Sequence, residues 1–341
     1  MSVFSARRID STMLGSIPNL TVRARRARYF RILLSLLTIV PIPVFAAAKD
    51  VRPIQLGGYK AVPVRYGSLN KMMLSVAING HPANLIVDTG ANQIILDASS
   101  AESFGVSPSR HGLRYVGFTQ INGQLFPVGF VRTLTAGSMN FGSSSVALLN
   151  SSARSSFSNR FENGNLRVDG VLGADILIRH KAVINCRTKF IFFKVDRSRP
   201  SQVASFALSE KFTKVPLRQE ENGAFTVPSS IHGQTGRLLV DTGAFITTFN
   251  EAVVRSLGIA LQPTPASARF TNGVARQVSI GQINDLTVGD FKVPAAKFGV
   301  AVLPKFALEQ GNTRVNGILG IDLLFNCHGI VDFDSMNLFL K

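Results

Sequence analysis

Two short stretches of the chain each place an aspartate directly after three large apolar residues. Asp88 follows Leu-Ile-Val, Asp241 follows Leu-Leu-Val, and each aspartate opens the same tetrapeptide, Asp-Thr-Gly-Ala. Burial of an ionised carboxylate is unfavourable unless the group is paired or hydrogen-bonded. Each aspartate is therefore either a turn residue that accepts backbone hydrogen bonds or a group whose altered acidity is used in chemistry. Repetition of the whole motif favours chemistry.

Two such carboxyl groups, brought together, could catalyse hydrolysis by acid–base chemistry. Carboxyl groups held close cannot both ionise, so the pair shares one proton and titrates in two coupled steps. The ionised member can take a proton from a bound water while the protonated member polarises a carbonyl, and the roles exchange when the leaving group is protonated. This chemistry needs no metal, no cofactor and no covalent intermediate.

An internal repeat accounts for the second copy of the motif. Residues 62–105 align without a gap with residues 215–258, at an offset of 153, and this places Asp88 opposite Asp241. Further on, 167–177 matches 314–324 at an offset of 147, because the first copy carries a longer Ser/Asn-rich stretch that we expect to be a surface loop. Two long copies indicate a duplicated domain that forms a pseudo-twofold pair.

Within each copy the local patterns predict strands, hairpins and short helices. Asn79-Gly80 separates two apolar runs and predicts a tight β-hairpin. Gly-rich hairpins are expected at 114–130 and 269–280. The expected helix N-terminal caps are Asp97 and Asn250, with Gly105 and Gly258 at the matching C-termini, and a second pair of caps is expected at Asp175 and Asp322.

The duplicated Asp-Thr-Gly-Ala, with Val-Leu-Gly or Ile-Leu-Gly downstream in each copy, resembles the retropepsin-like branch of the aspartic proteases. The chain is similar to bacterial exported aspartyl proteases with two retropepsin-like domains. The resemblance covers 62–194 and 215–341. It implies a mainly β, bilobed acid-protease fold, in which two retropepsin-like β-barrel lobes are related by a pseudo-twofold axis. We expect the lobes at 49–194 and 215–341, with a linker at 195–214.

By this resemblance Asp88 and Asp241 form the catalytic pair of an aspartic endopeptidase, with carboxylate oxygens ~3–5 Å apart. The threonines would hydrogen-bond to the opposite loop, and the glycines would let the two backbones approach. The alanines replace the hydroxyl residue of pepsin-like enzymes, which should raise the pKa of the pair and move its working range toward neutrality. The residues expected to support the site are Thr89, Gly90, Ala91, Thr242, Gly243 and Ala244.

The same resemblance makes each Gly-rich hairpin a flap over the cleft. The expected tips are Asn122-Gly123 in the first copy and Asn272-Gly273 in the second. An extended peptide or protein substrate would lie between the flaps and the aspartates.

The N-terminal 48 residues carry the pattern of a targeting segment. A basic stretch precedes an apolar run, 32–45, which ends in three alanines. The run is shorter than the ~20 residues that cross a membrane, and prolines interrupt it. We expect a cleaved signal peptide at 1–48 and an exported protein, periplasmic or secreted; an uncleaved membrane anchor is the alternative.

Charge and residue spacing argue against other classes of function. The net charge is +17, but the basic residues are scattered and no basic run is interleaved with aromatic residues, so we expect no nucleic-acid partner. The five histidines lack metal-ligand spacing, so no metal site is expected. We expect Cys186 and Cys327 to be two buried thiols rather than a disulfide.

Two alternatives remain open at this point. The same fold could serve as a non-catalytic peptide-binding module, although both intact Asp-Thr-Gly motifs favour an enzyme. Each lobe could also pair with a lobe of another chain, but the linker keeps the two lobes of one chain at high effective concentration. We therefore expect a monomer with an intramolecular pseudo-dimer.

Overall fold

The computed structural model describes residues 55–67, 70–108, 110–111, 115–121, 124–149, 167–269, 275–310 and 312–341. The predicted signal peptide, both hairpin tips and the predicted Ser/Asn-rich loop lie outside the described residues. All described residues belong to one compact unit. Within these ranges, no helix has the length and apolar character required to span a membrane.

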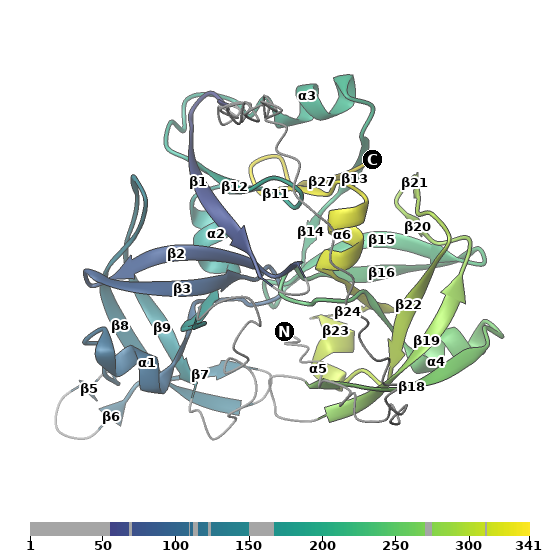
Figure 1. Cartoon of the computed structure of the whole chain (residues 1–341), viewed down its shortest axis with the longest axis horizontal. Coiled ribbons are helices and arrows are strands. Elements are labelled where there is room, and N and C mark those ends of the chain that lie inside the picture. The colour runs from purple at the N-terminus through teal and green to yellow at the C-terminus, as the bar shows by residue number, and fades with distance from the viewer. Residues whose placement is uncertain are drawn as a thin grey trace, which may run out of the picture. The chain divides into compact units, whose positions relative to one another are not determined.

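The first lobe is built on a six-stranded barrel (Figure 1). Its predicted hairpin forms at Asn79-Gly80, where φ is 51° and 87°, as a tight turn between twisted strands requires. The strands follow the order β2-β3-β10-β4-β9-β8, and β8 returns to pair with β2. Their bounds are β2 Met72–Ile78, β3 His81–Val87, β10 Gly170–Leu172, β4 Ile95–Asp97, β9 Met139–Leu149 and β8 Gln124–Ala136. The first Gly-rich hairpin joins β7, Phe118–Ile121, to β8.

The second lobe repeats this arrangement with one interruption. Its sheet runs β18-β19-β22-β17-β25-β16-β15-β20-β21, and β14 also pairs with β15. In place of the continuous β8 of the first lobe it has two separate strands, β19 and β20. The bounds are β14 Arg218–Gln219, β15 Phe225–Ile231, β16 Gln234–Val240, β17 Thr248–Asn250, β18 Leu261–Arg269, β19 Ala275–Ile283, β20 Thr287–Val288, β21 Phe291–Lys292, β22 Ala296–Ala301 and β25 Gly317–Leu319.

A six-stranded antiparallel sheet joins the lobes. Its order is β13-β27-β26-β11-β12-β1, with three strands from each half of the chain. At its centre Ile184 pairs with Val331, which is the equivalent residue of the other copy at an offset of 147. The pseudo-twofold axis therefore passes between these two residues. The bounds are β1 Tyr59–Tyr66, β11 Val183–Asn185, β12 Phe190–Lys194, β13 Thr213–Pro216, β26 Ile330–Asp332 and β27 Asn337–Leu340.

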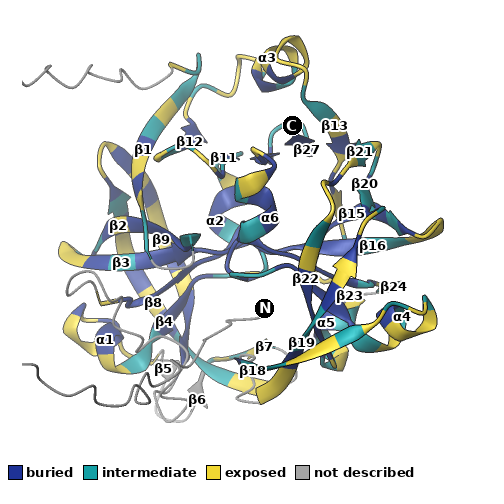
Figure 2. Ribbon diagram, turned by 45° about the vertical axis from the view of Figure 1, so that its right-hand side comes forward, coloured by how far each residue is buried: buried dark blue, intermediate teal, exposed yellow. Residues whose placement is uncertain are grey.

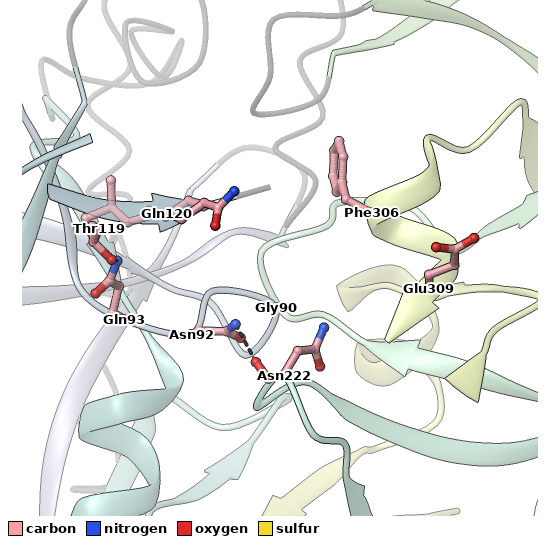
Figure 3. Close-up of a pocket in the computed structure, with 10 residues that line it drawn as sticks. Gly90, Asn92, Gln93, Thr119, Gln120, Asn222, Phe306 and Glu309 are labelled. Carbon is pink, nitrogen blue, oxygen red and sulfur yellow. Dashed lines mark hydrogen bonds between the residues drawn. The ribbon is translucent and has the colours of Figure 1, made fainter. Parts of the chain in front are cut away.

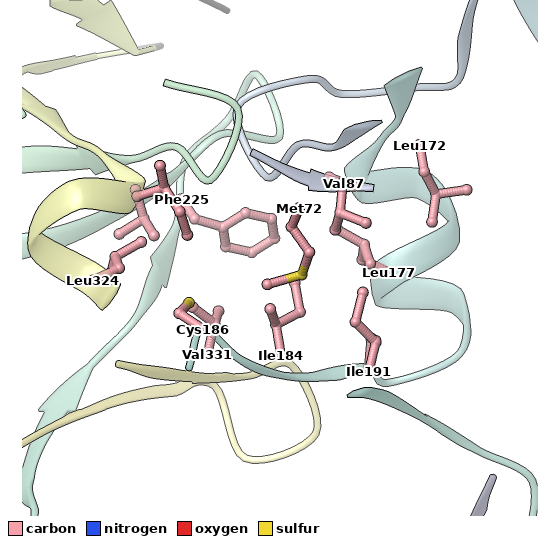
Figure 4. Close-up of a cluster of buried hydrophobic side chains, with 14 of the residues drawn as sticks. Met72, Val87, Leu172, Leu177, Ile184, Cys186, Ile191, Phe225, Leu324 and Val331 are labelled. Atoms are coloured by element: carbon pink, nitrogen blue, oxygen red, sulfur yellow. The ribbon is translucent and has the colours of Figure 1, made fainter. Parts of the chain in front are cut away.

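Side chains from both lobes share one buried cluster behind the site (Figure 4). Val87 and Ile184 come from the first half of the chain, and Phe225 and Val331 come from the second. Cys186 packs in the same cluster, and both cysteines are buried free thiols, which confirms that expectation. The lobes are thus fixed by a shared core as well as by the linker. The stretch predicted as a linker, 195–214, contains helix α3, Val203–Ser209, and the start of β13.

The first pair of predicted helix caps is correct in position. Helix α1, Ala98–Ser103, begins after Asp97, whose carboxylate accepts hydrogen bonds from the amides of Ser99 and Ser100. Helix α4, Glu251–Ser256, begins after Asn250, but the Asn250 side chain makes no capping bond. Its Oδ1 instead accepts a hydrogen bond from the Leu303 amide at 3.4 Å.

The second pair of predicted caps is wrong. Helices α2, Ala174–Arg179, and α6, Ile321–Asn326, begin after glycines, so Asp175 and Asp322 lie in the first turn. The reason is steric: a Cβ on Gly173 would lie 2.4 Å from the Gln93 carbonyl. The chain after each Asp-Thr-Gly loop crosses the start of a helix, so this N-cap position must be glycine and cannot carry a capping side chain. Figure 2 shows both helices in the middle of the fold, with buried, intermediate and exposed residues in each.

Candidate active site

The two Asp-Thr-Gly loops follow equivalent strands that end at the centre of the molecule. Asp88 comes directly after β3 and Asp241 directly after β16. Each strand is flanked by a parallel partner, so that the Asp88 amide donates to the Leu172 carbonyl at 3.1 Å and the Asp241 amide donates to the Leu319 carbonyl at 3.0 Å. The apolar-apolar-Gly segments recognised in the sequence therefore hold the loops from the side.

The two threonines lock the loops together across the pseudo-twofold axis. The Thr89 amide donates to Thr242 Oγ1 at 3.1 Å, and the Thr242 amide donates to Thr89 Oγ1 at 3.1 Å. Each hydroxyl in turn donates at 2.8 Å to a carbonyl of the opposite strand, that of Val240 or Val87. Both threonines are fully buried, so these four bonds are shielded from water.

The glycines bring each loop against the opposite aspartate. A Cβ on Gly90 would lie 2.6 Å from Cγ of Asp241, and a Cβ on Gly243 would lie 2.4 Å from Cγ of Asp88. Any side chain at either position would collide with a carboxyl group of the other lobe. The structure thus brings together Asp88 and Asp241 with all six residues expected to support them.

The two carboxyl groups differ in their backbone donors. Asp88 Oδ1 accepts one bond, from the Gly90 amide at 2.8 Å. Asp241 Oδ1 accepts two, from the amides of Gly243 and Ala244, both at 2.9 Å. Asp88 Oδ2 is buried and meets no donor among the described residues. Hydrogen bonds stabilise the ionised form, so this environment favours the proton on Asp88.

Burial dominates the acidity of Asp88. Removal from water raises the pKa of Asp88 well above its usual range, and the neighbouring carboxyl of Asp241 raises it further. The same two causes act on any pair of carboxyl groups forced together in a dry site. Burial lowers the pKa of Lys71, and nearby Asp88 offsets part of that effect whenever its carboxyl group is ionised.

Asp322 and Asp175 support the chain that follows the two loops. Asp322 Oδ1 accepts hydrogen bonds from the amide and the hydroxyl of Thr247, both at 2.7 Å. Burial raises the pKa of Asp322, and burial raises the pKa of Asp175 as well. Their role is to tie α6 and α2 to the loops, which the capping interpretation missed.

A pocket of about 430 Å³ opens beside Gly90 (Figure 3). One wall is β7 of the first Gly-rich hairpin, and the opposite wall comes from the second lobe, at α5 (Lys305–Leu308) and β23 (Glu309–Gln310). The first hairpin therefore overlooks the site, although its expected tip, Asn122-Gly123, lies outside the described residues. The second hairpin joins β18 to β19, and its expected tip, Asn272-Gly273, also lies outside them. Among the described residues no cluster of His, Cys, Asp or Glu could hold a metal ion.

Sequence reasoning passed over three residues near the site that the repeat could have revealed. Lys71 aligns with Ala224 at the offset of 153, and both are buried, so a lysine there was a visible anomaly. Asn92 and Gln93 align with Phe245 and Ile246. Each of these three residues differs in chemical type from the residue at the same position of the other repeat, and that difference could have revealed it.

Comparison with known proteins gives two matches to one family. The model of the aspartyl protease family matches residues 74–176 and again residues 227–323, more than half of the chain. No curated protein matches the sequence. The two matches confirm both the expected family and its occurrence in two copies.

Three solved structures illustrate the similarity in space. An aspartic proteinase from Irpex lacteus is 14% identical, with 83% of this chain and 97% of that chain covered and a TM-score of 0.44. Basic 7S globulin from soybean is 10% identical, with 83% and 95% covered and a TM-score of 0.48. Conglutin gamma from lupine seeds is 10% identical, with 83% and 95% covered and a TM-score of 0.45. On the strength of the family match in both repeats, the chain belongs to the aspartyl protease family.

Proposed function

We propose that the protein is an aspartic endopeptidase that hydrolyses peptide bonds with a water activated by Asp88 and Asp241. The observation that carries this proposal is the reciprocal seating of each loop glycine against the opposite carboxyl group, with Cβ positions 2.6 and 2.4 Å from the two Cγ atoms. A structural turn does not require two carboxyl groups from distant parts of the chain to face each other in a buried site.

The unequal hydrogen bonding assigns starting roles to the two groups. Asp241, whose carboxylate accepts two backbone hydrogen bonds, takes a proton from the water. Asp88, with a raised pKa, holds the shared proton and donates a hydrogen bond to the substrate carbonyl. The water then attacks the polarised carbonyl carbon. During the attack Asp88 gives its proton to the carbonyl oxygen, which forms a neutral gem-diol. On collapse, Asp241 passes its new proton to the leaving nitrogen, and Asp88 takes a proton back from one hydroxyl of the gem-diol.

The threonine bonds contribute by holding the pair in register. Acid–base catalysis of this kind requires both carboxyl groups to reach one water, so a small shift between the lobes would separate them. The four buried bonds of Thr89 and Thr242 oppose that shift. They hold the carboxyl groups in place before substrate arrives, and no reorganisation is then needed during the reaction.

The proposed substrate is an extended segment of a peptide or protein. The pocket beside Gly90 lies under a hairpin, and a second hairpin occupies the matching place in the other lobe. Both aspartates come from one chain, which supports a monomer as the working unit. The basic and apolar pattern of the first 48 residues supports export, so we place the activity in the periplasm or outside the cell.

Cleavage profiling with peptides prepared from a proteome tests the proposed function. Wild-type protein should cut internal peptide bonds, and the Asp88→Asn variant should cut none. Asp97→Asn is the matched control, because it removes a carboxylate of the same lobe at a helix cap where asparagine also serves. Peptides that bind the wild type but stay intact at every pH would support the binding-module alternative instead.

A further inference from the structure

The strict repeat exposes a chemical asymmetry directly beside the aspartates. The tetrapeptide Asp-Thr-Gly-Ala is identical in both loops, but Asn92-Gln93 follows in the first and Phe245-Ile246 in the second. The two pairs occupy equivalent places in the structure. A Cβ on Gly173 would strike the Gln93 backbone, and a Cβ on Gly320 would strike the Ile246 backbone. The chain that follows the loop is therefore amide-bearing in the first lobe and hydrocarbon in the second.

The amide side is a built pocket rather than a loose surface (Figure 3). Asn92 Nδ2 donates to the Asn222 carbonyl at 2.7 Å, and Gln93 Nε2 donates to Thr119 Oγ1 at 3.0 Å. These bonds fix both side chains and direct their amide nitrogens toward the protein. The amide oxygens of Asn92 and Gln93 receive no hydrogen bond from any described residue, so they remain as acceptors.

Two further polar groups complete this pocket. Gln120 projects from β7 on the lobe-one side, and Glu309 projects from β23 on the lobe-two side. Glu309 forms an ion pair with Lys305 at 3.5 Å, and its side chain is 51% exposed, so its charge is partly balanced and reachable. The lining thus offers several hydrogen-bond acceptors beside the apolar side chains of Ile95, Ile121 and Phe306.

The opposite side has the contrary character. Phe245 and Ile246 pack against a cluster that includes Ala268 of β18, Val278 of β19 and Leu303. Phe245 and Ile246 are themselves only partly buried, and Phe306, which also lines the pocket beside Gly90, packs against the same cluster. A polar side chain placed there would lose its hydrogen bonds to water without replacement, whereas an apolar one would not.

We propose that the cleft selects two different substrate side chains, one on each side of the scissile bond. A long side chain that carries hydrogen-bond donors, such as that of Gln, Lys or Arg, occupies the pocket beside Gly90. An apolar side chain lies against Phe245 and Ile246. This inference rests on the proposed peptidase function and adds its substrate class: segments in which a donor-bearing residue and an apolar residue flank the cut.

The test measures side-chain preference at each substrate position, with two loop-swap variants. In Asn92→Phe/Gln93→Ile the first loop takes the residues of the second, and in Phe245→Asn/Ile246→Gln the second loop takes those of the first. In wild type we expect kcat/KM for a donor-bearing side chain to exceed that for an apolar one by about tenfold at a single position. The first swap should abolish that preference, and the second should create it at the other position.

A milder variant and a binding assay keep the test decisive. Gln120→Leu changes an exposed pocket residue and should weaken the donor preference without a loop change. Selection of library peptides on the inactive Asp88→Asn protein should show the same two preferences. Cleavage by wild type with equal tolerance at both positions would overturn this inference and leave the peptidase intact. Failure of the wild type to cleave or bind any peptide would overturn both.

Discussion

Replacement of Thr89 by valine tests the interlobe lock with little change in shape. Valine keeps the branched side chain but lacks the hydroxyl, which accepts a hydrogen bond from the Thr242 amide at 3.1 Å and donates one to the Val240 carbonyl at 2.8 Å. Thr89 is fully buried, so no water replaces these bonds. The substitution therefore leaves two buried backbone groups without their partner.

The expected loss of stability follows from those two groups. A buried polar group left without its hydrogen bond is unfavourable by about 1–3 kcal/mol. A carbonyl tolerates the loss better than an amide, so we expect about 2–4 kcal/mol in total. Against a typical unfolding free energy of about 5–15 kcal/mol, this is a large fraction. Thr242→Val should lose a similar amount, because its hydroxyl makes bonds of equal length in the other direction.

Denaturant unfolding of four variants measures this loss. Thr89→Ser and Thr242→Ser retain the hydroxyl and should lose clearly less stability than the two valine variants. The folded valine variants, without denaturant, should also cleave peptides more slowly, because the two Asp-Thr-Gly loops are no longer held in register with each other. If Thr89→Val unfolds at the same denaturant concentration as Thr89→Ser, the hydroxyl does not hold the lobes and the interpretation is wrong.

Three other predictions address acidity, loop contact and export. Because burial and Asp241 raise the pKa of Asp88, the folded protein keeps a proton that the unfolded chain has lost. The free energy of unfolding should therefore fall as pH rises through that raised pKa. The pH–rate profile should be bell-shaped, with its basic limb above the ordinary carboxyl pKa of about 4. A basic limb below pH ~4 would contradict the raised pKa of Asp88. Gly90→Ala should lower kcat/KM at least about a hundredfold, because the new Cβ would lie 2.6 Å from Cγ of Asp241. Gly117→Ala is the control and should be tolerated, because its new Cβ would have its nearest neighbour, Val128 Cβ, at 3.7 Å. Equal activity of the two variants would refute the contact between Gly90 and Asp241. N-terminal sequencing of native protein should give a start near Lys49 in a non-cytoplasmic fraction, and an intact basic N-terminus in the cytosol would refute export.

Local sequence patterns predicted what depends on neighbouring residues. The turn at Asn79-Gly80 formed because both residues tolerate positive φ, here 51° and 87°. Asp97 caps its helix because the bond runs to amides two and three residues away. The family and its two copies were visible because the motif around each aspartate is duplicated at a fixed offset.

Features set by long-range contacts were missed or misassigned. Asp175 and Asp322 look like helix caps in isolation, but the N-cap position of each helix is a glycine. That glycine contacts the chain after an Asp-Thr-Gly loop, which leaves no room for a side chain. The pairing of Ile184 with Val331 joins strands far apart in sequence, which no local pattern encodes. The buried Lys71, which stands opposite Ala224, required comparison of the two copies position by position. The hairpin tips and the signal peptide stay predictions.

A double-mutant cycle of Asp88→Asn and Asp241→Asn measures the central claim, that the two aspartates act as one catalytic unit. The measurement is kcat/KM for one peptide that the wild type cleaves, in both single variants and the double variant. Because residues that act as a unit have strongly non-additive effects, each single variant should lose at least about a thousandfold, and the double variant should lose no more than either. Substantial cleavage by either single variant, or losses that multiply in the double variant, would contradict the account.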